Sequence, residues 1–492
     1  MNKYLLSIDQ GTTSSRAVIF NQSLEVVASS QQEFPQIYPN PGWVEHDPEE
    51  IWLSVKNVCN SVLKKSNLRA DQIFGLGITN QRETTLLWDS QTGKCVCNGI
   101  VWQDRRTAKY CLKLQDDGLQ KTIKEKTGLR LDPYFSASKL NWILNNVDGA
   151  RKLSDSNKLL FGTIDSFLLW RLTGGKVHAT DATNASRTLL FNIHTQEWDD
   201  ELLKIFNIPR QLLPKVKDCA THFGDTVENL FGAKIPILSI LGDQQAALIG
   251  QAGFKEGMTK CTFGTGCFAI SNTGKKPLAS KNKLLTTIAT RLNGSVTYAL
   301  EGSIFVAGSA IQWLRDELMI IKSAADTEEI ANRVGVIDNV TVVPAFAGLG
   351  APHWNPNAKG AILGLTRGTS KEEIITATIQ SVAFQAYDLY RAMADDGISF
   401  DTFRVDGGMV SNDWFIQFLS DILNIPIERP KNIESTVLGV AYLTAVSAEI
   451  LKNTDQISLL WGCEKRFEPS MRSELRESLL QNWSKAVNII QN

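Results

Sequence analysis

The sequence is poor in the features that mark disulfide-rich and metal-binding proteins. It has 8 cysteines in 492 residues, and only Cys95 and Cys97 lie close together. Neither a second cysteine pair nor a histidine cluster completes a zinc set beside them. The 5 histidines are dispersed and keep no metal-ligand spacing, so we assign none of them to catalysis. We expect reduced thiols in a cytoplasmic protein.

Long apolar runs and a charge bias are missing as well. The charge-free stretch 340–358 is interrupted by prolines, and the stretch 435–448 is short and rich in small residues, which suits a buried helix. The apolar run before Asp9 is too short for a signal peptide. With 51 Lys and Arg against 52 Asp and Glu, the net charge is −1. The sequence therefore predicts neither membrane insertion nor nucleic-acid binding.

What the sequence does contain is apolar material for large cores in an α/β pattern. Hydrophobic residues make up 43% of the chain, and short Val, Ile and Leu runs alternate with longer helical segments. Strands are predicted at residues 4–8, 17–20, 73–79, 84–88 and 235–241. A helix is expected after Asp47, which can cap it, because Pro48 suits the first helical position.

The chain also contains a weak internal repeat. Residues 5–20 have the pattern strand, Asp-Gln-Gly-Thr-Thr turn, strand, and residues 260–271 have the pattern strand, Phe-Gly-Thr-Gly turn, strand. Glycine and threonine at each tip let backbone N–H groups and hydroxyls approach an anion. One hairpin in each half predicts two related domains that face a common cleft, comprising residues 1–250 and 251–492.

The first hairpin carries the densest set of groups suited to a phosphate. Thr12, Thr13 and Ser14 offer hydroxyls, and Arg16 offers a fixed positive fork. Asp9, directly before the turn, is placed to hold Mg²⁺ directly or through water. An ordinary polar hairpin explains the same residues equally well, and the chain has neither a P-loop nor a dinucleotide-binding glycine motif.

A second candidate follows the strand predicted at 235–241. There Gly242 and Asp243 precede a helix-forming run, so Asp243 would lie at the carboxyl end of a strand, where open α/β sheets bind their ligands. Asp243 either caps the helix or acts as a base that accepts a proton from an attacking hydroxyl.

Three further blocks could contact a small polar ligand and a nucleotide. Arg82 and Glu83 could donate to and accept from hydroxyls, although such a pair is more often a structural ion pair. Trp102 suits the C–H face of a polyol, although it is more often a core residue. The block 406–412 either receives the flat face and edge of a base or forms a plain strand-to-helix turn.

Together these blocks resemble the FGGY family of carbohydrate kinases over nearly the whole chain. Six blocks occur in the family's order, at residues 8–16, 77–84, 102–107, 242–247, 263–268 and 406–408. The Asn-Gln-Arg-Glu-Thr block at 80–84 is the most diagnostic for glycerol over bulkier sugars. The resemblance implies an α/β fold of two actin-like (ribonuclease-H-like) ATPase domains facing a deep catalytic cleft. It also implies transfer of the γ-phosphoryl group of ATP to glycerol, giving sn-glycerol 3-phosphate and ADP.

The resemblance assigns roles residue by residue. The glycerol hydroxyls would contact Arg82, Glu83, Tyr134, Asp243 and Gln244, and the carbon edge would lie against Trp102 and Phe268. Phosphates would be held from the first domain by Thr12, Thr13, Ser14 and Arg16. The nucleotide would be held from the second by Thr265, Gly308, Gln312, Gly408 and Asn412. Asp9 and Asp243 would flank Mg²⁺, with Asp243 as the base, and the chain is expected to assemble as a homodimer or homotetramer.

Two alternatives to glycerol phosphorylation stay open from the residues alone. One is a related kinase for a larger polyol or ketose, and the other is a non-catalytic actin-like ATP-binding sensor. The presence of both Asp9 and Asp243 argues against the sensor, since a pure binder needs no base. Residues 224–232 depart from the turns that carry fructose 1,6-bisphosphate inhibition or histidine phosphorylation in some family members, so neither control is transferred here.

Overall fold

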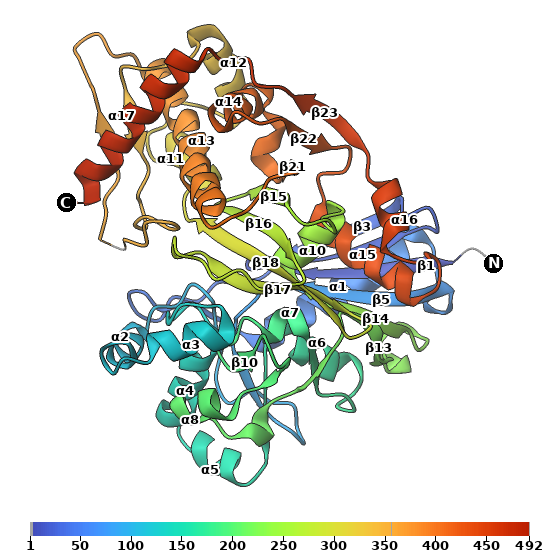
Figure 1. Cartoon of the computed structure of the whole chain (residues 1–492). Helices are drawn as coiled ribbons and strands as arrows, with labels where there is room; N and C mark the ends of the chain where they lie inside the picture. Colours follow the sequence, from blue (N-terminus) through green and yellow to red (C-terminus); the bar gives the residue numbers. More distant parts are fainter. Residues whose placement is uncertain (1–2, 356, 492) are drawn as a thin grey trace.

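The computed structural model describes residues 3–355 and 357–491, and its first half is built on a six-stranded sheet (Figure 1). The strand order is β13-β14-β5-β1-β2-β3. Strands β1, β5 and β14 are parallel, whereas β2, β3 and β13 pair antiparallel with their neighbours. The bounds are β1 Tyr4–Gln10, β2 Ser14–Phe20, β3 Val26–Glu33, β5 Ile73–Asn80, β13 Ala220–Asp225 and β14 Pro236–Gly242.

The second half is built on a seven-stranded sheet of order β17-β18-β16-β15-β21-β22-β23. Its bounds are β15 Met258–Phe263, β16 Cys267–Gly274, β17 Leu285–Leu292, β18 Ser295–Ile304, β21 Thr402–Asp406, β22 Ile427–Pro430 and β23 Cys463–Phe467. In both sheets an antiparallel hairpin, β1–β2 or β15–β16, is extended by a parallel strand, β5 or β21. The two hairpins thus hold equivalent positions, which confirms the internal repeat.

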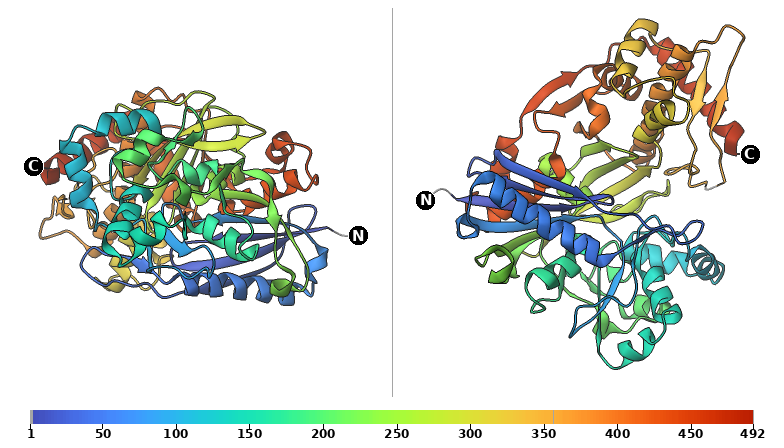
Figure 2. Two further views of the ribbon diagram at one scale, coloured as in Figure 1. Left: turned by 90° about the horizontal axis from the view of Figure 1, so that it is seen from below. Right: turned by 180° about the vertical axis from the view of Figure 1, so that it is seen from behind.

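Helices cover both faces of the sheets (Figure 2). Helix α1, Pro48–Ser66, packs on β2 and β3, and the Asp47 carboxylate caps it by accepting from the Glu49 N–H. The remaining helices of the first half are α2 Ala108–Asp116, α3 Gln120–Thr127, α4 Ser136–Asn146, α5 Ala150–Asp155, α6 Ile164–Leu172, α7 Ala182–Ala185, α8 Asp200–Ile205, α9 Glu228–Phe231 and α10 Asp243–Gly250. Those of the second half are α11 Gly308–Asp316, α12 Asp326–Val334, α13 Lys371–Asp395, α14 Asp413–Leu423, α15 Ser435–Ser447, α16 Thr454–Leu460 and α17 Ser473–Gln491.

Short strand pairs complete the fold, and one of them begins later than the sequence predicts. The pairs are β4 Glu45–His46 with β7 Gly99–Ile100, β6 Leu86–Asp89 with β8 Leu159–Gly162, β9 Ala179–Asp181 with β12 Lys215–Lys217, β10 Phe191–Asn192 with β11 Glu197–Trp198, and β19 Thr341–Val343 with β20 Ala361–Leu363. The strand expected at 84–88 starts only at Leu86: the chain bends at Glu83, which has φ 63°, and Thr85 forms only an isolated bridge with Ile100.

The two halves are interlocked by elements that pack on the other half. Helix α15, from the second half, packs on α10, β1, β5 and β14 of the first. The helices touch backbone to backbone, since a Cβ at Gly250 would lie 1.9 Å from the Ser435 carbonyl oxygen and one at Gly439 1.8 Å from that of Ala246. Conversely, Leu285, Ile288 and Tyr298 of β17–β18 lie in the hydrophobic core of residues 87–212.

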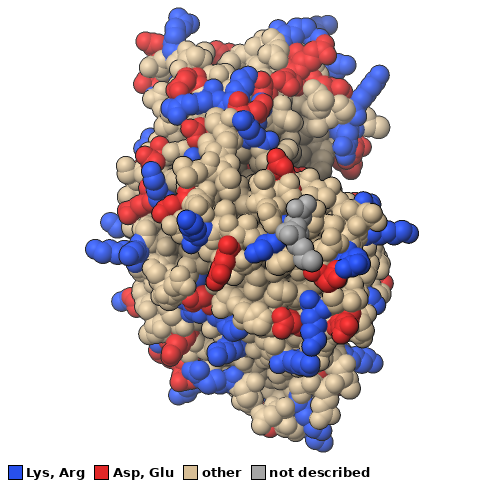
Figure 3. All heavy atoms as spheres, turned by 90° about the vertical axis from the view of Figure 1, so that its right-hand side faces the viewer, with Lys and Arg blue, Asp and Glu red and all other residues tan. Residues whose placement is uncertain are grey.

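The surface carries both signs of charge. On the face shown in Figure 3, Lys and Arg side chains are interspersed with Asp and Glu, without one large patch of a single sign. Among the described residues, no helix is both long enough and apolar enough to cross a membrane.

Candidate active site

The tip of the first hairpin is held by a network of neutral hydrogen bonds. The Gly11 N–H donates to the Ser14 carbonyl at 2.9 Å, which closes the turn. The Thr12 hydroxyl accepts from Trp102 Nε1 at 3.0 Å, and the Ser14 hydroxyl accepts from Gln31 Nε2 at 2.9 Å. Thr13 is exposed at the tip. The hydroxyl-rich turn that the sequence indicates is therefore present and partly open to solvent.

Arg16 leaves the hairpin towards the second half of the chain. Its guanidinium forms an ion pair with Glu434, which directly precedes α15. The pair is partly exposed, with 25% of the Arg16 side chain and 49% of the Glu434 side chain accessible. Arg16 therefore links the first hairpin to the other half of the molecule, besides any contact with a phosphate.

Asp9 and Asp243 form the carboxylate pair of the site. Asp9 lies on β1 opposite Arg16 and beside Thr79 of β5, and Asp243 is the first residue of α10. Burial, together with repulsion from Asp243, raises the pKa of Asp9 to about 7, and burial also raises the pKa of Asp243. Such mutual repulsion is what a cation between the two carboxylates would relieve.

These two carboxylates are a small donor set. No cluster of three or more His, Cys, Asp or Glu side chains is placed to hold a metal ion among residues 3–355 and 357–491. Mg²⁺ in phosphoryl-transfer enzymes is usually bound by one or two carboxylates together with substrate phosphates and water. The pair Asp9 and Asp243 fits that mode of binding rather than an all-protein cage.

Arg82 and Glu83 lie in the turn after β5, and both side chains are buried. Arg82 Nε lies 3.2 Å from Asp243 Oδ1, so the guanidinium adjoins the carboxylate pair. The pKa of Glu83 is raised by burial and held back by two nearby arginines, Arg187 and Arg82. The structure thus brings Arg82, Glu83 and Asp243 together, as the sequence predicts.

Two charged residues that the sequence did not single out complete this cluster. Glu301, on β18, accepts from Arg82 Nη1 at 2.6 Å and from Arg82 Nη2 at 2.9 Å. Arg187, which follows α7, donates from Nε to Glu83 at 2.6 Å and from Nη2 to Glu301 at 3.0 Å. We call Arg82, Glu301, Arg187 and Glu83 the charge ring. All four side chains are at most 2% exposed.

Three aromatic side chains wall the space beside the charge ring. The Trp102 ring makes edge contacts with Tyr134 at 5.6 Å and with Phe268 at 6.4 Å between ring centroids. Burial raises the pKa of Tyr134, so its hydroxyl stays protonated. Phe268 comes from β16 of the second half, so both halves contribute to the wall.

Gln244 is positioned by a buried lysine that the sequence reading missed. Lys260 Nζ donates to Gln244 Oε1 and to the Thr262 hydroxyl, both at 2.6 Å. Burial lowers the pKa of Lys260, and nearby carboxylates, Asp406 first, act against this. Its position inside an ordinary strand pattern gave no sign that it faces the site.

The second hairpin is built from backbone groups rather than charges. The Thr265 carbonyl accepts from the N–H groups of Ala307 and Ser309, and the Gly264 carbonyl accepts from the Gly308 N–H at 2.9 Å. The tip therefore lies against the start of α11, the helix on which Gln312 is exposed.

The block after β21 lies on the same side of the second sheet. Gly407 has φ 93°, and a Cβ there would lie 2.5 Å from the Phe263 carbonyl oxygen, so this turn packs directly against the second hairpin. Gly408 has open space around it. The Asn412 side chain caps α14 by accepting from the Phe415 N–H, and it donates to the Thr327 hydroxyl at 3.2 Å. Asn412 thus has a structural role in addition to the predicted nucleotide contact.

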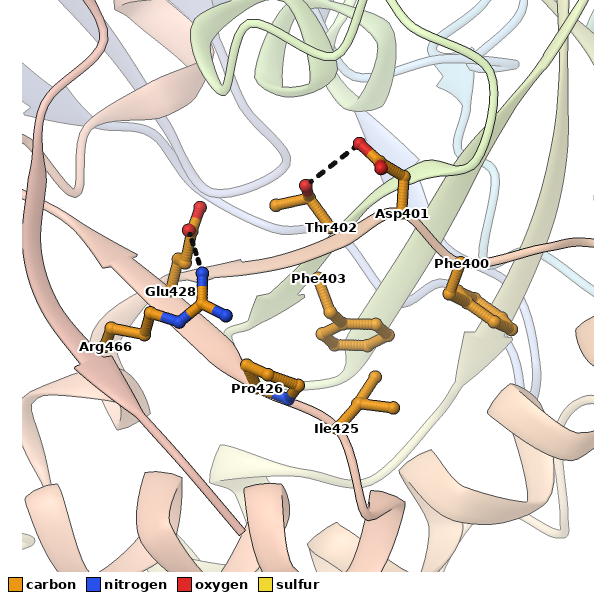
Figure 4. Close-up of a pocket in the computed structure, with 8 residues that line it drawn as sticks. All are labelled: Phe400, Asp401, Thr402, Phe403, Ile425, Pro426, Glu428 and Arg466. Carbon is orange, nitrogen blue, oxygen red and sulfur yellow. Dashed lines mark hydrogen bonds and ion pairs between the residues drawn. The ribbon is translucent and has the colours of Figure 1, made fainter.

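A separate hollow lies at the other end of these strands, where β21 and β22 begin (Figure 4). It is lined by Phe400, Asp401, Thr402, Phe403, Ile425, Pro426, Glu428 and Arg466, and by none of the predicted site residues. These residues cluster at the starts of β21 and β22, whereas ligands of open α/β sheets bind at the carboxyl ends of parallel strands. We therefore place the site at the hairpin tips and not in this hollow.

Two sheets that share a hairpin-plus-parallel-strand unit, each with a Gly/Thr hairpin, together with the carboxylate pair of the first half, define an α/β phosphotransferase that uses ATP. Models of the FGGY family of carbohydrate kinases match this chain, the N-terminal domain at residues 4–250 and the C-terminal domain at residues 259–448. The chain belongs to the FGGY family of carbohydrate kinases, and it has that family's two-domain, actin-like fold.

Curated relatives and solved structures agree with this assignment. The chain is 57% identical to a glycerol kinase of Marinomonas sp. (strain MWYL1) over 99% of both chains, and 56% identical to glycerol kinase 1 of Pseudomonas aeruginosa over the whole of both. The crystal structure of Plasmodium falciparum glycerol kinase with ADP superposes with a TM-score of 0.93, at 38% identity over 100% of this chain and 99% of that one. A gluconate kinase from Lactobacillus acidophilus has a TM-score of 0.89 at 23% identity, over 99% of this chain and 98% of that one, and shows the fold alone.

Proposed function

We propose that this kinase transfers the γ-phosphoryl group of ATP to a terminal hydroxyl of glycerol, giving sn-glycerol 3-phosphate and ADP. The observation that carries the proposal is the grouping of Arg82, Glu83 and Asp243 beside a wall of three aromatic rings. Full-length relatives at 53–57% identity that are named glycerol kinases support the same acceptor.

Arg82 and Glu83 would bind the glycerol hydroxyls. Arg82 retains one Nη2 hydrogen for a hydroxyl, and no described hydrogen bond occupies Glu83 Oε2, which can accept one. Tyr134 and Gln244 would complete the polar contacts, while Trp102 and Phe268 would face the carbon edge. An analogue that lacks a hydroxyl would leave buried charged groups unpaired, which is the strong form of substrate discrimination.

Asp243 would act as the general base. Its carboxylate lies at the start of α10 beside Arg82 and would accept the proton of the attacking hydroxyl, while Arg82 Nε at 3.2 Å favours the ionised form. Phosphoryl transfer needs little covalent help from the protein and depends on positioning and charge stabilisation. Because the base contacts Arg82, which would bind the acceptor, the same group of residues would position the acceptor and take up its proton.

Asp9 and Asp243 would hold Mg²⁺, which when bound neutralises charge on the phosphate oxygens. Thr12, Thr13, Ser14 and Arg16 would hold phosphates from the first half. Thr265, Gly308, Gln312, Gly408 and Asn412 would hold the nucleotide from the second. We further propose that residues 1–250 and 251–492 are two domains that close on these ligands, which excludes water as a competing acceptor. Assembly as a homodimer or homotetramer and residence in the cytoplasm stay predictions, which light scattering and cell fractionation test.

The experiment is ADP release from Mg-ATP by the purified protein, with glycerol, xylulose, gluconate and no acceptor compared side by side. We expect release only with glycerol. Activity with xylulose or gluconate alone would transfer the proposal to a larger acceptor. Absence of turnover with every acceptor, despite ATP binding, would favour a sensor.

The variant Asp243→Asn tests the base in the same assay. Because general-base catalysis contributes roughly 10²–10⁴-fold, we expect a loss of kcat in that range while the protein still binds ATP. Activity near that of the wild type would show that positioning alone carries the rate and that the base is misassigned.

A further inference from the structure

The charge ring joins three segments that are far apart in the sequence. Arg82 and Glu83 come from the turn after β5, Arg187 follows α7, and Glu301 lies on β18 of the other sheet. Within the ring, positive and negative side chains alternate, and its formal charges sum to zero. We propose that Glu301 and Arg187 are positioning residues of the acceptor site, which hold Arg82 and Glu83 so that their remaining polar atoms face the substrate. This inference deepens the proposed function and rests on it for the identity of the acceptor.

Glu301 fixes the guanidinium plane of Arg82. Its two carboxylate oxygens accept from Nη1 and Nη2 at 2.6 and 2.9 Å, which is the bidentate geometry that sets both position and orientation. Gln245 accepts the second Nη1 hydrogen at 3.2 Å, and Asp243 lies 3.2 Å from Nε. Of the five N–H groups, one on Nη2 is left for a ligand. Without Glu301, Gln245 and Asp243 would still contact Nη1 and Nε, but no described partner would hold Nη2.

Arg187 fixes Glu83 in a conformation that its backbone does not favour. Glu83 has φ 63°, a left-handed region that side-chain-bearing residues rarely occupy because it is strained for them. Its carbonyl accepts from the Ser136 hydroxyl at 3.0 Å, and its Oε1 accepts from Arg187 Nε at 2.6 Å. Holding Oε1 in this way leaves Oε2 as the oxygen for a substrate hydroxyl.

Stability alone does not account for the ring. Buried ion pairs are often no more stable than well-packed apolar side chains of similar volume, because four charges must be desolvated. In addition, Arg187 Nη1 is buried without a hydrogen-bond partner in the described structure, which is itself unfavourable. We therefore attribute the charge ring to the positioning of Arg82 and Glu83 rather than to stability.

The nearby arginines keep Glu301 ionised, although burial opposes this. The pKa of Glu301 is lowered to about 2, with Arg187 and Arg82 as the opposing charges. Its strand is also fixed to the acceptor-binding half, since Tyr298 of β18 donates to the Ile193 carbonyl at 2.8 Å and Thr287 of β17 contacts the Ser186 hydroxyl at 3.1 Å. Glu301 thus acts from the second sheet as a firm support for the substrate-binding turn.

The test compares Glu301→Gln and Glu301→Asp with the wild type. Glu301→Gln removes the charge, whereas Glu301→Asp keeps the charge balance and shortens the reach by one methylene, so it remains informative where the first variant fails to fold. Asp421→Asn is the matched control, because Asp421 is also a buried carboxylate, but it accepts from Gln417, Ser470 and Met471 and has no described contact with the charge ring.

The measurements are KM for glycerol and for ATP, glycerol binding by calorimetry without ATP, and the ratio of kcat/KM for glycerol over 1,2-propanediol. We expect both Glu301 variants to raise KM and Kd for glycerol about 10- to 100-fold, to leave KM for ATP within about twofold, and to lower the glycerol preference. Arg187→Lys, which keeps the charge but loses the fork, should give the same pattern more weakly. Asp421→Asn should lower the melting temperature and leave all three kinetic quantities unchanged.

The contrary outcomes are distinct. Unchanged glycerol KM in both folded Glu301 variants, or equal losses for glycerol and ATP that follow the melting temperature, would overturn the positioning role. Wild-type activity only on xylulose or gluconate overturns the proposed function, and the same variants compared on that acceptor still decide the positioning role. A wild type that neither turns over nor binds any of these acceptors overturns both.

Discussion

The two hairpins occupy the same place in their sheets but offer a ligand different chemistry. The first, β1–β2, presents Asp9, Arg16 and hydroxyls, and these are supported by side chains such as Trp102. The second, β15–β16, presents no charged side chain at its tip and is fixed by backbone hydrogen bonds to the start of α11. The same hairpin topology thus presents charged side chains and hydroxyls in the first half and a close-fitting backbone surface in the second, which matches the proposed division between metal with phosphates and nucleotide.

The difference follows from what surrounds each tip. Gly266 lies so close to other backbone that a side chain is excluded, since a Cβ there would lie 2.6 Å from the Ile304 carbonyl oxygen. At Gly11 the nearest atom to such a Cβ is the Ser14 carbonyl oxygen of the same turn, 3.3 Å away, so the steric conflict there is smaller. The role of charge at the first hairpin and the role of close packing at the second can therefore be tested separately.

The largest effect is expected for Asp9→Asn, which removes the carboxylate of the first hairpin and leaves Arg16 in place. We expect kcat to fall by at least about 100-fold, because charge stabilisation by a bound metal contributes several kcal/mol. Repulsion between Asp9 and Asp243 also disappears, so the metal-free protein should melt at a higher temperature near pH 8. Kinetics and thermal melts check both, and a loss of activity together with a lower melting temperature would contradict the assignment.

Gly266→Ala tests the packing of the second hairpin. The added methyl meets the carbonyl oxygens of Ile304 and Phe305 at 2.6 and 3.2 Å, so backbone must shift, at a cost of up to about 3 kcal/mol. Denaturant unfolding and KM for ATP are the measurements, and we expect nucleotide affinity to fall more than glycerol affinity. Gly368→Ala is the matched control, because the nearest atom to its Cβ is 3.9 Å away. Equal effects of the two substitutions would contradict the close-packed description.

Mild acid should lower the stability of the fold through His46, a residue that supports the first hairpin. Burial lowers the pKa of His46 to about 4, from 6.5, and its ring contacts Gln36 at 2.7 Å, whose amide in turn donates to the Thr12 carbonyl. Between pH 7.5 and 5 the unfolded chain takes up a proton at this position that the folded protein does not. Stability therefore falls with falling pH, by about 2 kcal/mol for this group.

Urea unfolding of the wild type and of His46→Gln at the two pH values checks this. The variant should lose about 2 kcal/mol less than the wild type on acidification. An unchanged pH dependence in His46→Gln would show that His46 does not carry the effect.

The smallest effect is expected at the ion pair between Arg16 and Glu434. Because the pair is partly exposed, Glu434→Gln should change stability by less than about 1 kcal/mol. It also frees Arg16 for a phosphate, so KM for ATP should stay constant or fall, whereas Arg16→Gln should raise it. The same direction of change in both variants would show that Arg16 serves only the ion pair.

Most of the fold could be predicted from the sequence, because local residue patterns define the repeated hairpin unit. The hairpins, the strands β1, β2, β5 and β14 and the helix start at Asp47 all follow from alternation, turn residues and capping chemistry. The charge ring could not be predicted in the same way. Glu301 lies inside an ordinary strand, and Arg187 follows a four-residue helix, so only the long-range packing shows that Glu301 meets Arg82 and Arg187 meets Glu83.

The charge ring also bears on how this sequence can diverge. Loss of any one of its four charges leaves an unbalanced charge in a dry interior, whereas replacing an opposite pair together keeps the sum at zero. Single steps away from the present arrangement therefore pass through poorly folded or poorly discriminating intermediates. We expect residues 82, 83, 187 and 301 to change together among descendants of this chain. A new acceptor specificity would then require substitution of several of these residues rather than of one.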